Sequence, residues 1–112
     1  MRFIALAFVL VTGCAGLAAP AEKKSHFATF GTNKVHYVTA GKGDKALVFV
    51  HGWSGNQDFW REQVPAVADK AKVLLIDLPG HGKSDKPHTA YSMDFFAEAV
   101  LAVAMPPGGK PP

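Results

Sequence analysis

The chain has 112 residues and a formal net charge of +3, and 48% of its residues are hydrophobic. This length allows one small domain at most, and the hydrophobic content is typical of a globular core rather than of a disordered chain. Basic residues occur singly or in pairs without an accompanying aromatic stripe, which excludes a nucleic-acid surface. Because Cys14 is the only cysteine, a disulfide framework and a cysteine-based zinc site are excluded as well.

The first 21 residues have the layout of an export signal. A positive charge at Arg2 precedes an apolar run over residues 3–11, and small residues follow. The run is much shorter than the roughly 20 residues that a membrane-spanning helix needs. We therefore expect residues 1–21 to be a signal peptide and the protein to be exported.

Two interpretations of this signal remain open. Residues 11–14 resemble a bacterial lipobox, and this resemblance implies that Cys14 is lipid-modified and tethers the protein to a membrane of the bacterial cell envelope. In the alternative, an ordinary secretory signal is cleaved after Ala19 or Ala21, and the product is periplasmic or secreted.

Two strands joined by a tight turn are predicted at the start of the domain. After a polar linker, residues 26–30 and 34–40 have strand-forming composition, and the segment Gly-Thr-Asn at residues 31–33 separates them. This pattern predicts an opening β-hairpin. We expect His26 and His36 to be partly exposed strand residues.

A strand, a helix and a second strand are predicted next. Five apolar residues at 46–50 predict a strand that is buried on both faces, and residues 72–77 predict another strand. Between them, residues 58–70 carry apolar side chains at helical intervals, and Pro65 should kink this helix or split it in two. A strand-helix-strand order implies two parallel strands in one sheet.

A second covering helix is predicted after a loop. Ser92 is a suitable N-cap, and Asp94 would lie in the first turn, near the positive end of the helix dipole. The apolar stripe predicted to face the sheet consists of Met93, Phe96, Ala97, Val100, Leu101 and Ala104. Residues 106–112 are proline, glycine and one lysine, so the helix must end before them.

Two motifs follow the two apolar strands. Residues 51–53 read His-Gly-Trp, and residues 77–85 read Asp-Leu-Pro-Gly-His-Gly-Lys-Ser-Asp. Together these motifs resemble the α/β-hydrolase family, over about residues 27–103. The resemblance implies an α/β fold with a partial doubly wound sheet of the α/β-hydrolase type, in which an opening β-hairpin precedes β-α-β-α. It implies that residues 22–105 are the N-terminal part of such a domain. The composition of residues 106–112, by contrast, indicates a Pro/Gly-rich tail.

The resemblance assigns roles to residues in both motifs. The backbone N–H of Trp53 would form one half of an oxyanion hole, with Gly52 allowing close backbone approach and His51 supporting the turn. From these residues alone, it is equally open that Gly52 ends a strand and that Trp53 belongs to the core. The second motif is expected to be structural, because its glycines permit unusual backbone angles and its polar side chains can bond loop amides. The residues concerned are Asp77, Gly80, Gly82 and Ser84.

The groups that carry out catalysis in this family have no counterpart in the chain. The family places a nucleophile in a Gly-X-Ser-X-Gly turn between strand and helix, followed by an acid and then a histidine. No serine has that context, and Ser54, which comes nearest, stands where the oxyanion loop belongs. His81 comes too early in the chain to be the catalytic histidine.

Two other kinds of site are excluded by spacing. The segment Gly-Lys-Ser at residues 82–84 lacks the first glycine of a phosphate-binding loop, because that position is Asp77. His51, His81 and His88 lack the spacing of metal ligands on a helix or hairpin. We expect neither a metal nor another cofactor.

Two functional hypotheses follow. The leading one is an N-terminal fragment of an exported α/β-hydrolase, inactive by itself, whose full-length relatives hydrolyse an ester, epoxide or related bond in a small-molecule substrate. The competing one is a non-catalytic exported or membrane-tethered binding or interaction protein derived from the same fold. Half of a parallel sheet leaves an unpaired apolar edge, so a monomeric chain that unfolds cooperatively would favour the second hypothesis.

Overall fold

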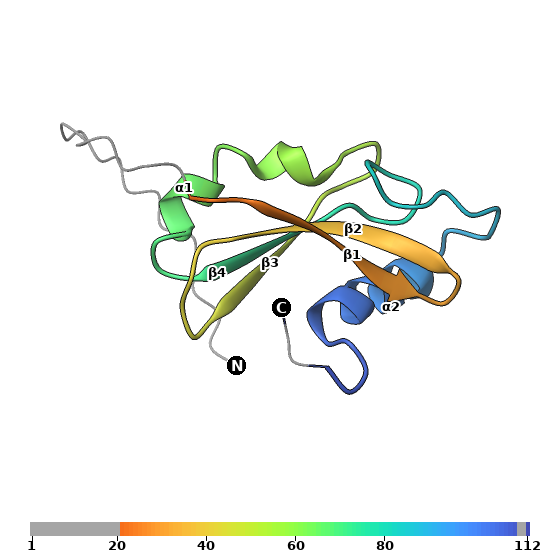
Figure 1. The fold of residues 1–112 in the computed structure, drawn as a ribbon. Coiled ribbons are helices and arrows are strands. Elements are labelled where there is room, and N and C mark those ends of the chain that lie inside the picture. Colours follow the sequence, from red (N-terminus) through yellow and green to blue (C-terminus); the bar gives the residue numbers. More distant parts are fainter. Residues whose placement is uncertain (1–20, 110–111) are drawn as a thin grey trace.

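The computed structural model describes residues 21–109 and residue 112, so the expected signal peptide, apart from its last residue, lies outside the described part, as does Cys14. The described strands form one sheet in the order β1-β2-β4-β3 (Figure 1). They are β1 (Lys24–Phe30), β2 (Asn33–Ala40), β3 (Ala46–Val50) and β4 (Lys72–Ile76). β2 pairs antiparallel with β1 and with β4, whereas β3 and β4 are parallel. The predicted α/β class, opening hairpin and parallel pair are therefore confirmed.

Helices cover both faces of the sheet. The 3-10 helix η1 (Gln57–Trp60) and the helix α1 (Val64–Val67) lie on one face, and α2 (Met93–Ala104) lies on the other (Figure 1). The core on the first face comprises Val38, Ala40, Val64, Ala68, Val73 and Leu75. The core on the second face comprises Val35, Leu74, Ile76, Ala99 and Val103. Successive side chains of β4 thus point into opposite cores, as expected for a strand.

The prediction that residues 46–50 are buried on both faces is wrong, because β3 is an edge strand. Among the described residues β3 pairs only with β4, and Leu47, Val48 and Val50 are 41%, 40% and 41% exposed. The fully buried strand is β4, whose residues 73–76 are at most 2% exposed. An apolar run indicates that a strand can be buried, but it does not indicate the position of that strand in the sheet.

The segment between β3 and β4 is split into two helical pieces, as predicted, and the break at residues 61–63 lies just before the piece that contains Pro65. η1 begins after Asn56, whose side-chain oxygen accepts a hydrogen bond from the N–H of Asp58 at 2.9 Å. Pro65 lies in the first turn of α1, where its missing N–H breaks no helical hydrogen bond. Two short helical pieces therefore replace one long helix, and Val64, 1% exposed, packs on the sheet.

α2 has the predicted start but presents a different face to the sheet. The Ser92 Oγ accepts a hydrogen bond from the N–H of Phe95 at 3.1 Å, which caps the helix. The buried residues of α2 are Phe96, Ala99 and Val103. The predicted stripe is therefore wrong in part, since Met93 is 79% and Leu101 54% exposed. Apolar residues surround most of this helix, so their spacing does not single out one face, and Ala99, at 0% exposure, lies in the core against the sheet.

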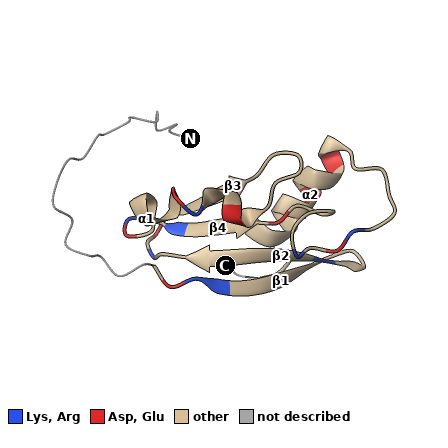
Figure 2. Ribbon diagram, turned by 90° about the horizontal axis from the view of Figure 1, so that it is seen from above, with Lys and Arg blue, Asp and Glu red and all other residues tan. Residues whose placement is uncertain are grey.

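Charged residues stay at the margins of the sheet. Lys24, Lys34 and Lys72 lie at or near the starts of their strands. In Figure 2, the blue segments of lysine and arginine lie at strand ends and in loops. Within the described part of the chain, Asp77 is the one buried carboxylate, at 2% exposure. No helix in that part is long and apolar enough to cross a membrane.

Candidate functional site

The two sequence motifs meet at the carboxyl ends of β3 and β4. The two strands are parallel, and their last residues, Val50 and Ile76, are paired. The loop that begins at His51 and the loop that begins at Asp77 therefore start side by side. In open α/β sheets, ligands bind outside this edge of the strands.

His51 joins the two loops. Its Nε2 accepts a hydrogen bond from the N–H of Leu78 at 3.1 Å, and its Nδ1 donates to the carbonyl oxygen of Gly52 at 2.8 Å. Since Nε2 is an acceptor, the neutral ring carries its proton on Nδ1. The side chain is only 3% exposed, so the first loop is fixed to the second through a buried contact.

Trp53 and Ser54 form the outer part of the first loop. Trp53 is 79% exposed, so the alternative that it belongs to the core is wrong. Ser54 has a φ of 63°, a left-handed conformation that is uncommon outside glycine, and its N–H donates to the Nε2 of His81 at 3.3 Å. The N–H of Trp53 makes no hydrogen bond to any described residue. The N–H of Trp53 is thus left free of described partners, as is the N–H of Gly52 beside it, although the loop is anchored on both sides.

His81 holds this loop from the other side. Its Nδ1 donates to the carbonyl oxygen of Pro79 at 3.0 Å, which leaves Nε2 as the acceptor for Ser54. The ring also packs against the indole of Trp53, with ring centroids 5.5 Å apart. Sequence reasoning excluded His81 as a catalytic base but did not foresee that it positions the first loop.

A pocket of about 290 Å³ lies over these loops. Its lining residues are Trp53, Ser54, Gly80, His81, Lys86 and Tyr91. The Tyr91 side chain is fixed at one side of the pocket, because its hydroxyl donates to the carbonyl oxygen of Pro87 at 2.7 Å and its ring stacks on Phe96 of α2. We refer to this cavity as the site pocket.

Behind the site pocket, the Asp77 carboxylate fixes three segments. Its Oδ1 accepts a hydrogen bond from the N–H of Gln57 at 2.7 Å, at the start of η1. Its Oδ2 accepts from the N–H of Lys83 at 3.1 Å and from Nδ1 of His36 at 2.7 Å. Asp77 thus connects both loops to β2 without lining the pocket.

Ser84 and Gly82 complete this arrangement. The Ser84 hydroxyl donates to the carbonyl oxygen of Asp77 at 2.5 Å and accepts from the N–H of His36 at 2.8 Å. Gly82 has a φ of 50°, and a Cβ at this position would collide with the Asp77 carboxylate. The loop can therefore close around the carboxylate only with glycine here.

The expectation that His36 is partly exposed is wrong. His26 is half-buried, as expected, but His36 is only 1% exposed and lies between β1 and the Asp77 loop. Its burial is possible because Asp77 and Ser84 satisfy its polar groups. Side chains alternate along a strand, so His36 lies on the same face of β2 as the apolar Val38. This alternation in the sequence could have predicted that His36 is buried.

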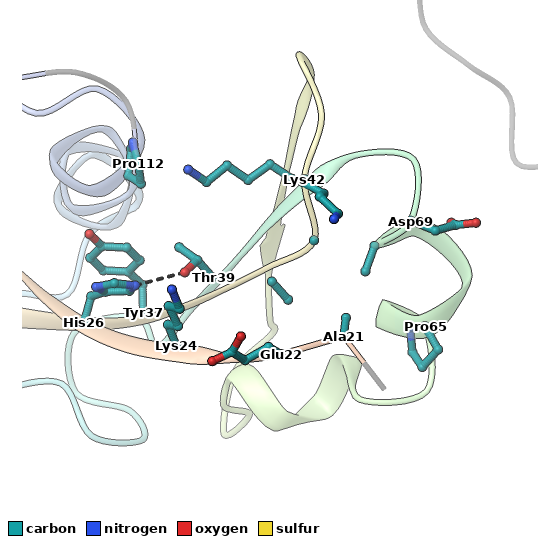
Figure 3. Close-up of a pocket in the computed structure, with 14 residues that line it drawn as sticks. Ala21, Glu22, Lys24, His26, Tyr37, Thr39, Lys42, Pro65, Asp69 and Pro112 are labelled. Atoms are coloured by element: carbon teal, nitrogen blue, oxygen red, sulfur yellow. Dashed lines mark hydrogen bonds between the residues drawn. The ribbon is translucent and has the colours of Figure 1, made fainter. Parts of the chain in front are cut away.

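A larger cavity of about 760 Å³ lies at the other end of the sheet (Figure 3). Residues from β1 and β2 line it, among them His26 and Tyr37. The His26 ring is hydrogen-bonded to the hydroxyl of Thr39 at 2.9 Å, and Figure 3 marks this bond with a dashed line. Lys72, the first residue of β4, also lines it, so this cavity lies at the amino ends of the parallel strands. No residue of the two motifs lines it, and it is not the candidate site despite its size.

In the described residues, no group of three or more histidine, cysteine, aspartate or glutamate side chains is arranged to hold a metal ion. His51 and His81 do come together, with ring centroids 5.0 Å apart, but each is engaged in hydrogen bonds within the loops.

Comparison with known proteins agrees with the fold and the motifs. A family model described as alpha/beta hydrolase fold matches residues 45–111. A soluble epoxide hydrolase from Corynebacterium sp. (strain C12) is 42% identical over 79 residues, covering 70% of this chain and 27% of the relative. A pimeloyl-(acyl-carrier protein) methyl ester esterase from Edwardsiella ictaluri is 41% identical over 66 residues, covering 59% of this chain and 25% of the relative.

The solved structure of the epoxide hydrolase CorEH superposes with a TM-score of 0.70 at 37% identity, covering 74% of this chain and 29% of that one. The mixed sheet with helices on both faces is thus that of an α/β-hydrolase. The chain belongs to the α/β-hydrolase family. It spans about a quarter of the length of the relatives that it matches.

Proposed function

We propose that residues 22–105 are the N-terminal part of the catalytic domain of an exported hydrolase that cleaves an ester, epoxide or related bond in a small-molecule substrate. In this proposal the N–H of Trp53 is one donor of the oxyanion hole, beside the site pocket. The observation that carries it is the N–H of Trp53, which has no partner among the described residues although the loop around it is anchored by His51 and His81.

The relatives support the reaction class. The similar proteins named above are an epoxide hydrolase and a methyl ester esterase, and a haloalkane dehalogenase from Bradyrhizobium elkanii has a similar fold with a TM-score of 0.71. The nucleophile, the acid and the catalytic histidine would come from residues beyond 22–105. The exposed apolar residues of β3 agree with this proposal, since a further strand of the domain could pair with that edge.

The first loop would act electrostatically. Attack on a carbonyl places negative charge on its oxygen, and a backbone N–H that is already fixed near that oxygen stabilises the charge without reorganisation. Loss of one such donor typically lowers kcat by about 10²–10³-fold. The hydrogen bonds of His51 and His81 would supply the required rigidity.

A chimera tests this role. Residues 22–105 would replace the aligned part of the Corynebacterium soluble epoxide hydrolase, and hydrolysis of an epoxide and of an ester would be measured. We expect a folded, active chimera in which Trp53→Pro, which removes the backbone N–H, lowers kcat by about 10²–10³-fold. Trp53→Ala keeps the N–H and is the matched control, so it should act mainly on KM through the lost indole.

Circular dichroism would first establish that each chimera is folded. Equal kcat values for the Trp53→Pro and Trp53→Ala chimeras would contradict the oxyanion role. A folded but inactive parent chimera, together with a monomeric 112-residue chain that unfolds cooperatively, would instead favour a non-catalytic binding or interaction protein.

Export and lipid attachment at Cys14 are a separate part of the proposal and rest on the sequence of residues 1–21. In a bacterial host fed with labelled palmitate, the protein should take up the label and sediment with membranes, and Cys14→Ser should abolish both. Ala18→Ser is the matched control and should change neither. An unlabelled wild-type protein whose mature chain begins at Pro20 or Glu22 would show an ordinary secretory signal instead.

A further inference from the structure

Three side chains outside the site pocket form a continuous hydrogen-bonded chain. The Ser25 Oγ lies 2.6 Å from Nε2 of His36, and Nδ1 of His36 lies 2.7 Å from Oδ2 of Asp77. The residues come from β1, from β2 and from the end of β4, three neighbours in the sheet. We call them the Ser25–His36–Asp77 chain. None of the three lines the site pocket.

The positions of the protons follow from the partners of Asp77. Its carboxylate accepts hydrogen bonds from two backbone N–H groups, those of Gln57 and Lys83, so it acts as an acceptor on both oxygens. The Nδ1 of His36 must then carry the proton that it shares with Asp77. In the neutral ring Nε2 is left as an acceptor, and the Ser25 hydroxyl donates to it. This is the tautomer that a general base requires.

Burial differs along the Ser25–His36–Asp77 chain. Nucleophilic catalysis needs an accessible nucleophile and a base that is protected from water. His36 and Asp77 are 1% and 2% exposed, whereas Ser25 is exposed and lies on β1, an edge strand of the sheet. The ring of Phe27 packs on the imidazole, with centroids 5.1 Å apart, and helps to keep water from it. The base and its orienting carboxylate are thus protected, and the hydroxyl is accessible.

We propose that Ser25 is an activated nucleophile that accepts an acyl group from small activated esters. The Ser25 Oγ forms a bond to the carbonyl carbon, and the hydroxyl proton passes to Nε2 of His36. The bond from that carbon to the leaving alkoxide or phenoxide breaks, and the leaving oxygen takes the proton from Nε2. Asp77 holds the imidazole in place and balances its transient positive charge.

The substrate class follows from the surroundings of Ser25. Ser25 lies in neither of the two cavities described above, so those cavities cannot select a large acyl group for it. Small, intrinsically reactive esters such as 4-nitrophenyl acetate are therefore the expected donors. This activity goes beyond the proposed hydrolase function and needs only residues of the described chain.

Covalent labelling of the 112-residue chain tests the proposal. The chain would be treated with 4-nitrophenyl acetate under native conditions and in urea, and the acetylated residue located by peptide mass spectrometry. General base catalysis contributes about 10²–10⁴-fold, so native Ser25 should be acetylated faster than denatured Ser25 by a factor in that range. Ser25→Ala should remove the label, and Thr29→Ala, which deletes an exposed hydroxyl on the same strand, should leave it unchanged.

A second variant separates an activating role of His36 from a merely structural one. His36→Gln removes the base, and if circular dichroism shows it folded, its Ser25 should react no faster than in urea. Acetylation of Ser25 at the same rate in the native and denatured chain would overturn the proposal, whatever the fate of this variant. Rapid native acetylation at a different residue would overturn it as well.

Discussion

Asp77→Asn is expected to destabilise the protein by about 3 kcal/mol, because every arrangement of the amide leaves at least one partly buried backbone N–H without its acceptor. The carboxylate accepts from the N–H of Gln57 on one oxygen and from the N–H of Lys83 and the imidazole of His36 on the other. An amide has only one oxygen, so its NH₂ group must face at least one of the two backbone N–H groups. A loss of this size is a large part of the stability of a small domain.

Urea unfolding followed by circular dichroism would measure this effect. Asp85→Asn is the matched control, because Asp85 belongs to the same motif but is exposed and accepts one hydrogen bond, from the N–H of Lys34 at 2.8 Å. The amide oxygen can still accept that bond, so the control should lose less than about 1 kcal/mol. Equal losses for the two variants would contradict the central role of Asp77.

The second large effect is expected at Gly82, where alanine should cost about 3 kcal/mol. Part of this cost is the left-handed backbone conformation, with a φ of 50°, and the larger part is the collision of the new Cβ with the Asp77 carboxylate. Moving that carboxylate would weaken the same hydrogen bonds that Asp77→Asn removes. The free energy of unfolding, from urea titration, is again the quantity to compare.

Gly31 provides the control that separates the two contributions. It has a φ of 60°, and a Cβ there would meet no atom within 4 Å, so Gly31→Ala should lose only the backbone contribution of about 1 kcal/mol. The difference between the two variants then reports the collision alone. If the two alanine variants were equally stable, the carboxylate could move at no cost and the loop would be less rigid than its contacts indicate.

Local features of the fold could be predicted because local residues determine them. Two helical pieces form after β3, the second with Pro65 in its first turn, and Ser92 caps α2, since each effect depends only on chain neighbours. The meeting of the His51 loop and the Asp77 loop was also predictable, because parallel strands place their carboxyl ends at one edge.

Features that depend on distant partners could not be predicted in the same way. The edge position of β3 is decided by which strands lie beside it, and the face of α2 is decided by how its side chains pack against the sheet. His36 can be buried because Asp77, 41 positions later, pairs with its Nδ1, while Ser25 pairs with its Nε2. The residues next to His36 in the sequence do not indicate that Asp77 will be its partner, and those next to Asp77 do not indicate His36.

The place of β4 between β2 and β3 has a consequence for how the chain folds during synthesis. β1 and β2 are adjacent in sequence and can pair as soon as both have left the ribosome, but β3 has no neighbour until β4 follows it. β4 must therefore pair with β2 and with β3, which were both synthesised before it. Pairing between strands that are distant in sequence forms slowly. Until β4 is inserted, β2 and β3 both present unpaired edges, and this interval is when a chaperone would be needed most.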